Sequence, residues 1–184
     1  MQFKEIIGQD DIKRQLIQTV VENRVSHAQL FLSAEGSGAL PLAIAYAQYL
    51  NCQNKSASDS CGECSSCRKY ERYIHPDLHF SLSYKAFEAD TKVLIMWLPE
   101  FLDREGNALL KIIEEPSPNT LFILVAQNQE QILSTILSRT QIVKVPKLPD
   151  NEVEDYLVKK ASLSENQATE YSFLADGNLI EAKA

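Results

Sequence analysis

The chain has 184 residues, of which 45% are apolar and 23% are charged, and its net charge is −7 at pH 7. This charge argues against nucleic-acid binding by bulk electrostatics alone, because that function usually comes with clustered Lys and Arg. The N-terminus has no basic start before an apolar run, and no apolar stretch approaches the roughly 20 residues of a membrane span. We therefore expect a globular cytoplasmic protein without membrane contact.

Predicted strands and helices alternate along the first four fifths of the chain. A helical spacing of apolar residues over 9–23 is followed by an apolar run at 28–33, a glycine-containing turn and a helical stretch at 40–50. Further strands are predicted at 77–82, 93–97, 121–126 and 141–145, and further helices at 104–114 and 129–138. The alternation predicts an α/β fold with a parallel five-stranded sheet covered by helices on both faces.

The pattern changes at Pro146 and Pro149, after which only helices are predicted, near 150–161 and 164–174. We predict a sheet-containing domain at 1–147 and a small all-helical domain at 148–184. The stretch from 179 begins an apolar face with nothing after it to pack on, so we expect this helical domain to be truncated.

One connection conflicts with the predicted sheet. The strands at 77–82 and 93–97 are separated only by residues 83–92, whereas a parallel crossover usually needs a dozen or more residues. Either these two strands are not adjacent, or a segment near 83–92 is missing from the chain.

The glycine turn contains Gly36 and Gly38 and resembles a phosphate-binding loop that lacks its chemical groups. In a working loop, a Lys neutralises phosphate charge and a Ser or Thr hydroxyl binds magnesium. Ala39 and Leu40 stand at those two positions. A tight turn between strand and helix is therefore favoured over a nucleotide site.

The acidic residue that such a site needs at the end of a later strand is also missing. The strand at 93–97 ends in Trp97 and is followed by Leu98, while Glu100 comes several residues late. We interpret Glu100 as an exposed loop acid. Because two independent parts of the nucleotide-binding constellation are lost, we do not expect the chain to hydrolyse ATP.

All four cysteines of the chain lie between residues 52 and 67, at Cys52, Cys61, Cys64 and Cys67. Each C-x-x-C turn can present two thiolates to one ion, so the spacing predicts a structural zinc site with four protein ligands. A redox or free-thiol cluster is the alternative. Four protein ligands leave no open position for catalysis.

Ser138 and Arg139 follow a predicted helix near the end of the sheet region. An arginine at a helix C-terminus is most often a solvated charge or one that pairs with the helix dipole. Alternatively, an arginine at the edge of a nucleotide-binding fold can reach the γ-phosphate of a neighbouring subunit. His27, which precedes an apolar strand, is interpreted as a structural histidine and not as a ligand.

Taken in order, these motifs resemble the bacterial clamp-loader subunits of DNA polymerase III, a family within the AAA+ class, and in particular their δ′ branch. The resemblance is carried by residues 25–31, the turn at 35–38, the four-cysteine module, and residues 107–116, 119–124 and 135–140. It implies an AAA+ RecA-like domain, a helical lid domain, and a helical collar domain that this chain lacks.

The resemblance implies a non-hydrolysing scaffold in DNA replication. In that family, the residues matching Ser138 and Arg139 project into the ATP site of an adjacent γ/τ subunit and act as an arginine finger. The implied partners are the γ/τ and δ subunits and, through the complex, the sliding clamp and primer-template DNA. Family membership would associate the chain with a DNA-directed DNA polymerase, a nucleotidyltransferase complex.

Two other functions stay open at this stage. An ATP-hydrolysing γ/τ-type subunit shares the zinc module, but the residues at the lost phosphate and magnesium positions favour the δ′ branch. The turn at 176–181 also lacks the nucleotide-sensing arginine of active members, and Thr140 replaces the family's usual Cys. A small zinc-ribbon nucleic-acid binder would bind DNA tightly and with strong salt dependence, which the acidic composition disfavours.

Overall fold

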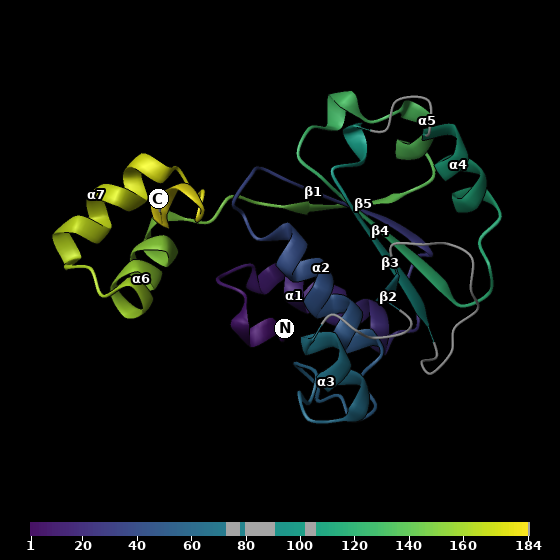
Figure 1. Ribbon diagram of the computed structural model, residues 1–184, viewed down its shortest axis with the longest axis horizontal. Helices are drawn as coiled ribbons and strands as arrows, with labels where there is room; N and C mark the ends of the chain where they lie inside the picture. The colour runs from purple at the N-terminus through teal and green to yellow at the C-terminus, as the bar shows by residue number, and fades with distance from the viewer. Residues whose placement is uncertain (73–77, 80–90, 102–105, 184) are drawn as a thin grey trace.

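The computed structural model describes residues 1–72, 78–79, 91–101 and 106–183, and its centre is a parallel five-stranded sheet (Figure 1). The strands are β1 (Ala28–Ser33), β2 (Leu78–His79), β3 (Lys92–Trp97), β4 (Thr120–Ala126) and β5 (Gln141–Val145). Their order is β2-β3-β4-β1-β5, and every neighbouring pair is parallel. The predicted fold class is confirmed.

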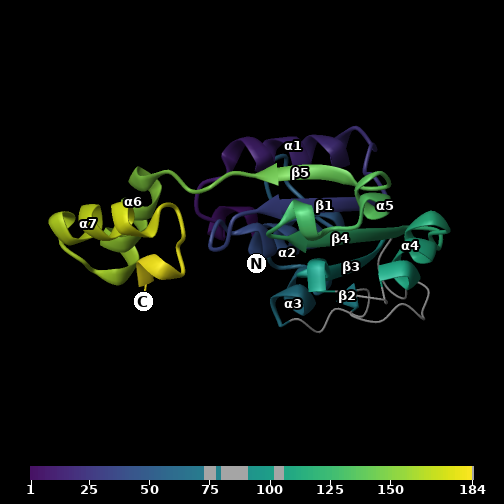
Figure 2. The same ribbon diagram turned by 90° about the horizontal axis from the view of Figure 1, so that it is seen from above.

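Helices cover both faces of the sheet (Figure 2). The helices of this part are α1 (Asp10–Val21), α2 (Ala39–Leu50), α3 (Ser65–Glu71), α4 (Gly106–Glu114) and α5 (Ser134–Leu137), with short 3-10 turns η1 (Phe3–Glu5), η2 (Pro99–Phe101) and η3 (Gln129–Gln131). Successive strand residues point to opposite faces, so Ile123 of β4 packs with α1 and α2, while Leu124 packs with α4 and α5. The central strands β1, β3 and β4 are thus buried on both sides, whereas most residues of the edge strand β5 are exposed.

The two strands whose short connection conflicted with a parallel sheet are adjacent. Leu78 of β2 pairs with Val93 of β3, and the pairing is parallel. The interpretation that they are not neighbours is therefore wrong. The described part of β2 covers only two of the predicted residues 77–82, and residues 80–90 of the connection lie outside the described residues.

The prediction of a single helix over 129–138 is wrong, because this segment forms two short elements, η3 and α5. The Asn128 side chain accepts a hydrogen bond from the Glu130 amide and starts η3. The chain then becomes extended at Ile132, which is 5% exposed and packs in the core beside Ile136. The extended residue lets both isoleucines reach the sheet.

The remaining helices, α6 (Asp150–Ala161) and α7 (Glu165–Ala175), lie to one side of the sheet in Figure 1 and form a core of their own. The stretch from Leu179 does have a packing partner, contrary to expectation: Leu179 and Ala182 join this core, and residues Glu181–Lys183 form the 3-10 turn η4. The domain boundary at 147/148 stays a prediction. Within the described residues, no helix is long and apolar enough to cross a membrane.

Candidate functional site

The glycine turn connects β1 to α2 at the carboxyl end of the sheet. Gly36 and Gly38 both have positive φ angles, of +71° and +86°, which glycine adopts without strain. Gly38 is the N-cap of α2, so Ala39 begins the helix and is buried, while Leu40 is half-buried. The predicted tight turn between strand and helix is present.

The turn is covered by the chain's own residues from the segment after α7. The Leu179 amide donates to the Gly36 carbonyl at 3.3 Å, and a Cβ on Gly36 would lie 1.8 Å from Asn178 Oδ1. A cavity of about 410 Å³ beside the turn is lined mainly by apolar side chains, including Trp97, together with Lys183. The place of a nucleotide in a working loop is therefore partly filled and largely apolar.

The close contact between Gly36 and Asn178 predicts unequal effects for two matched substitutions. Gly38→Ala meets no atom within 4 Å, so it should cost only the strain of a positive φ, about 1–2 kcal/mol. Gly36→Ala carries a similar strain and must also push Asn178 away, which should add about 1–3 kcal/mol. Chemical denaturation of both variants measures the difference, and equal losses would contradict the described packing.

Glu100 has a structural partner that the sequence did not reveal. Its Oε1 accepts hydrogen bonds from the amides of Gln127 and Asn128, at 2.8 and 3.4 Å, directly after β4. The interpretation as an exposed loop acid is wrong, because the residue is half-buried and holds the loop at the end of a neighbouring strand.

The four cysteines converge into one cluster. Their Sγ atoms all lie within 4.8 Å of one another, with 3.5 Å between Cys52 and Cys61 and 3.9 Å between Cys61 and Cys67. Four thiolates at about 2.3 Å from one tetrahedral ion would be roughly 3.8 Å apart. All four are free thiols. The cluster therefore fits a metal such as zinc.

Backbone amides already point at the sulfur atoms. The Cys64 amide donates to Cys61 Sγ at 3.3 Å, and the Cys67 amide donates to Cys64 Sγ at 3.4 Å. Hydrogen bonds from the Glu63 and Cys64 amides lower the pKa of Cys61 to about 6. Burial raises the pKa of the Cys67 thiol well above its usual range. Amide donors favour the thiolate form that a metal requires.

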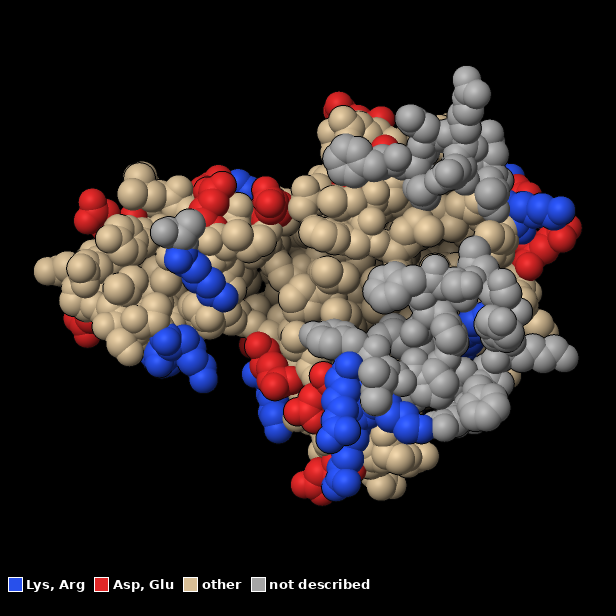
Figure 3. Space-filling model, in the orientation of Figure 1, with Lys and Arg blue, Asp and Glu red and all other residues tan. Residues whose placement is uncertain are grey.

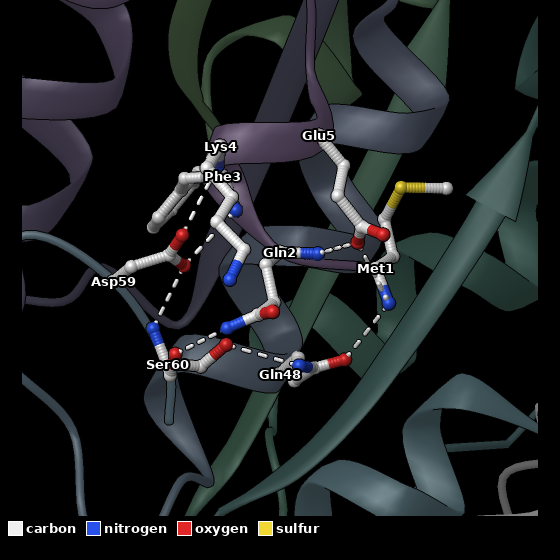
Figure 4. Close-up of polar contacts among 8 residues, drawn as sticks. All are labelled: Met1, Gln2, Phe3, Lys4, Glu5, Gln48, Asp59 and Ser60. Carbon is white, nitrogen blue, oxygen red and sulfur yellow. Dashed lines mark hydrogen bonds and ion pairs between the residues drawn. The ribbon is translucent and has the colours of Figure 1, made fainter. Parts of the chain in front are cut away.

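The N-terminus is bound to the cysteine module (Figure 4). The Asp59 carboxylate accepts from the amides of Phe3 and Lys4, both at 3.0 Å, and thereby caps the first turn, η1. The Gln2 side chain donates to the Ser60 carbonyl. These contacts join residues more than 50 positions apart, so the module is part of the main fold.

Removal of the Asp59 carboxylate should release this contact. We expect Asp59→Ala to lower the free energy of unfolding by about 1–2 kcal/mol, the usual cost of losing a cap. Asp59→Asn keeps one acceptor oxygen and should lose less. Denaturant unfolding together with limited proteolysis of the N-terminus tests both variants, and equal behaviour of the two would contradict capping by the carboxylate.

Ser138 and Arg139 form an exposed turn after α5, at the start of β5. Ser138 Oγ donates to the Thr135 carbonyl, and Arg139 Nη1 donates to the same carbonyl at 3.0 Å and to Ser138 Oγ at 3.2 Å. Thr140 Oγ1 donates to the Ile136 carbonyl at 3.0 Å. The threonine at the usual Cys position therefore stabilises the turn.

Arg139 also forms an ion pair with Glu114, the last residue of α4, with 2.7 Å between Nε and Oε1. The two side chains are 41% and 46% exposed. Sequence reasoning missed this partner, because the two residues are 25 positions apart and glutamates at helix ends are common. His27, by contrast, is structural as predicted, since its Nε2 donates to the Ile113 carbonyl at 3.2 Å.

The structure keeps the predicted site residues apart. The glycine turn follows the carboxyl end of β1, whereas Arg139 precedes the amino end of β5, and these strands run parallel in register. Four residue steps along a strand, from Gln141 to Val145, span on the order of 13 Å. The cysteine module lies at the far end of α2 from the glycine turn (Figure 1). Arg139 therefore does not reach the glycine turn of its own chain.

The parallel sheet, the strand, glycine turn and helix unit, and the added helices define an AAA+-type fold. A variant of Thermotoga maritima RuvB matches with a TM-score of 0.62 at 14% identity, covering 97% of this chain and 60% of that one. The Bacillus subtilis DNA clamp loader delta protein matches with a TM-score of 0.51 at 13% identity, covering 92% of this chain and 54% of that one.

The chain belongs to the family described as "DNA polymerase III, delta subunit", whose model matches residues 8–82 and 78–149. It is 32% identical to the DNA polymerase III subunit delta' of Haemophilus influenzae, over 85% of this chain and 53% of that protein. The corresponding subunit of Bacillus subtilis is 29% identical, over 83% of this chain and 52% of that protein. The tau/gamma subunit of Haemophilus influenzae is 28% identical, over 84% of this chain and 25% of that protein. The predicted resemblance to δ′-type clamp-loader subunits is confirmed, and the chain spans about half the length of these δ′ relatives.

Proposed function

We propose that this chain is a non-hydrolysing δ′-type subunit that supplies Arg139, supported by Ser138, to the ATP site of a neighbouring γ/τ-type subunit. The observation that carries this proposal is the location of Arg139. It is exposed near the amino end of β5, away from the chain's own glycine turn, so it cannot contact a phosphate held at that turn but is free to meet one held by a neighbouring subunit. An arginine supplied in this way stabilises the charge that develops on the transferred phosphoryl group.

The residues around the glycine turn support the proposal that this chain does not hydrolyse ATP. Ala39 and Leu40 supply neither the cation nor the hydroxyl of a phosphate site, and Trp97 lines the cavity where an acidic residue would be needed. The turn's Gly36 carbonyl is already bonded to the Leu179 amide. Lys183 also lines the cavity, but it comes from η4 and its ammonium lies 4.6 Å from the Tyr156 ring centroid, so the glycine turn itself offers no cation to a triphosphate.

We further propose that the cysteine cluster holds one structural zinc ion through Cys52, Cys61, Cys64 and Cys67. When bound, the metal would crosslink the loop after α2 to α3, because one ligand precedes the loop and another lies in the helix. The four thiolates complete a tetrahedral shell, so the proposed role is to stabilise the module.

The proposed setting is cytoplasmic DNA replication, with γ/τ and δ subunits as direct partners. Contact with the sliding clamp and primer-template DNA would then occur through the complex. On the face in Figure 3, the Lys and Arg side chains of the described residues form separate groups, several of them next to Asp and Glu side chains, and no continuous basic surface. In this account residues 1–147 form the AAA+ domain and 148–184 the helical lid.

A γ/τ-type ATPase is the second candidate, because the tau/gamma relative is nearly as similar as the δ′ relatives. The two candidates differ in what the chain adds to a mixture of partner γ/τ and δ subunits. A δ′-type chain should raise ATP turnover although it has none alone, whereas a γ/τ-type chain should turn over ATP by itself. Failure to stimulate the partner subunits would contradict the proposed function.

A further inference from the structure

We propose that Glu114 is a positioning residue that holds the Arg139 guanidinium in the orientation needed to reach a neighbouring ATP site. This inference rests on the proposed function, because it concerns the orientation of the proposed arginine finger. Three acceptors hold the side chain. Glu114 Oε1 contacts Nε at 2.7 Å, and the Thr135 carbonyl and Ser138 Oγ accept from Nη1.

These contacts leave the Nη2 edge of the guanidinium for a ligand. Within the described residues, no group is hydrogen-bonded to Arg139 Nη2, and the side chain is 41% exposed. A free arginine side chain samples many rotamers, and fixing one of them on binding has an entropic cost. A guanidinium already held through Nε and Nη1 avoids part of that cost when Nη2 meets a phosphate oxygen.

Glu114 and Arg139 both follow residues that are buried in the same core. Glu114 follows Ile113, which is 1% exposed and whose carbonyl accepts from His27. The Arg139 amide donates at 3.1 Å to the carbonyl of Ile136, which is 2% exposed. Both isoleucines belong to the cluster on the α4 and α5 face. The tertiary structure therefore fixes the position of the carboxylate relative to the arginine.

The exposure of the pair separates positioning from stabilisation. Exposed ion pairs contribute little to folding, and salt screens them. If Glu114 only stabilised the fold, its removal would change the free energy of unfolding slightly and would leave the turnover rate of the partner ATPase unchanged. If it orients Arg139, its removal should change the turnover rate of the partner ATPase while leaving the unfolding midpoint and the metal content as they are.

The experiment compares five variants of the chain in a complex reconstituted with γ/τ and δ subunits. Glu114→Ala should lower kcat by about tenfold, well within the 10²-fold that misplacing a catalytic group can cost, with KM for ATP unchanged. Glu114→Gln keeps an oxygen acceptor for Nε and should lie between Glu114→Ala and wild type. Glu115→Gln, a neighbouring exposed residue, is the matched control and should match wild type. Arg139→Ala combined with Glu114→Ala should be no worse than Arg139→Ala alone.

The outcomes separate this inference from the proposed function. If Arg139→Ala impairs turnover and Glu114→Ala does not, the positioning role is wrong and the arginine finger stands. A rise in kcat for Glu114→Ala would mean that the carboxylate restrains the arginine, which also overturns positioning. If Arg139→Ala has no effect, both the finger and its positioning residue are wrong.

Discussion

Replacing Arg139 with alanine is expected to abolish nearly all hydrolysis at the ATP site next to this chain. An arginine that stabilises the transferred phosphoryl group is worth about 10³- to 10⁵-fold in rate. The loss should appear in single-turnover hydrolysis by the reconstituted complex. The Arg139→Ala chain itself should fold normally, because its side chain is exposed and its ion pair with Glu114 is a surface contact.

Two further variants serve as controls for this result. Arg139→Lys keeps the charge but lacks the planar fork that contacts Glu114 and a phosphate oxygen together, so it should recover only a small part of the rate. Arg14→Ala removes another exposed arginine, whose partner is Asp11 on the same helix, and should leave turnover unchanged. Full activity of the Arg139→Ala complex would contradict the arginine-finger assignment.

Replacing Cys67 with serine is expected to remove bound zinc and to unfold the cysteine module. Structural zinc contributes an apparent 10–16 kcal/mol in isolated zinc-finger peptides, and this is an upper limit here because Tyr70 and Cys67 are also packed in the protein. The zinc content measured by elemental analysis should fall from one equivalent to nearly none, and the unfolding midpoint should fall with it. Ser65→Ala, in the same segment but exposed, should keep its zinc.

The same site should lose zinc on acidification. The pKa of Cys61 is lowered to about 6 by the Glu63 and Cys64 amides, so this thiol is mostly ionised at pH 7 without metal. Burial raises the pKa of Cys67, so zinc must displace its proton on binding. Affinity should therefore rise with pH and fall steeply below about pH 6, where Cys61 is protonated as well. Release of zinc to a chromophoric chelator, measured across this pH range, checks that affinity rises with pH. Retention of zinc that is independent of pH would contradict thiolate ligation.

Local sequence patterns predicted the sheet and the cysteine cluster because both are encoded by spacing along the chain. Strands buried on both faces are nearly continuous apolar runs, as β4 is after its first residue, Thr120, and paired C-x-x-C turns bring their own sulfurs together. The contacts of Arg139 with Glu114, of Gly36 with Asn178 and of Asp59 with the N-terminus join distant segments, so no local pattern indicates them. The helix predicted over 129–138 was wrong because periodicity alone does not reveal that the chain must extend at Ile132 to bury it.

The central claim is that this chain has no working ATP site of its own, so that any hydrolysis it promotes takes place at another subunit's site. Equilibrium ATP binding and steady-state turnover by the purified chain, with its zinc content measured in the same sample, test this most directly. We predict about one equivalent of zinc and no turnover. Turnover that copurifies with the chain and disappears when the glycine turn is altered would contradict the account and would favour a γ/τ-type ATPase.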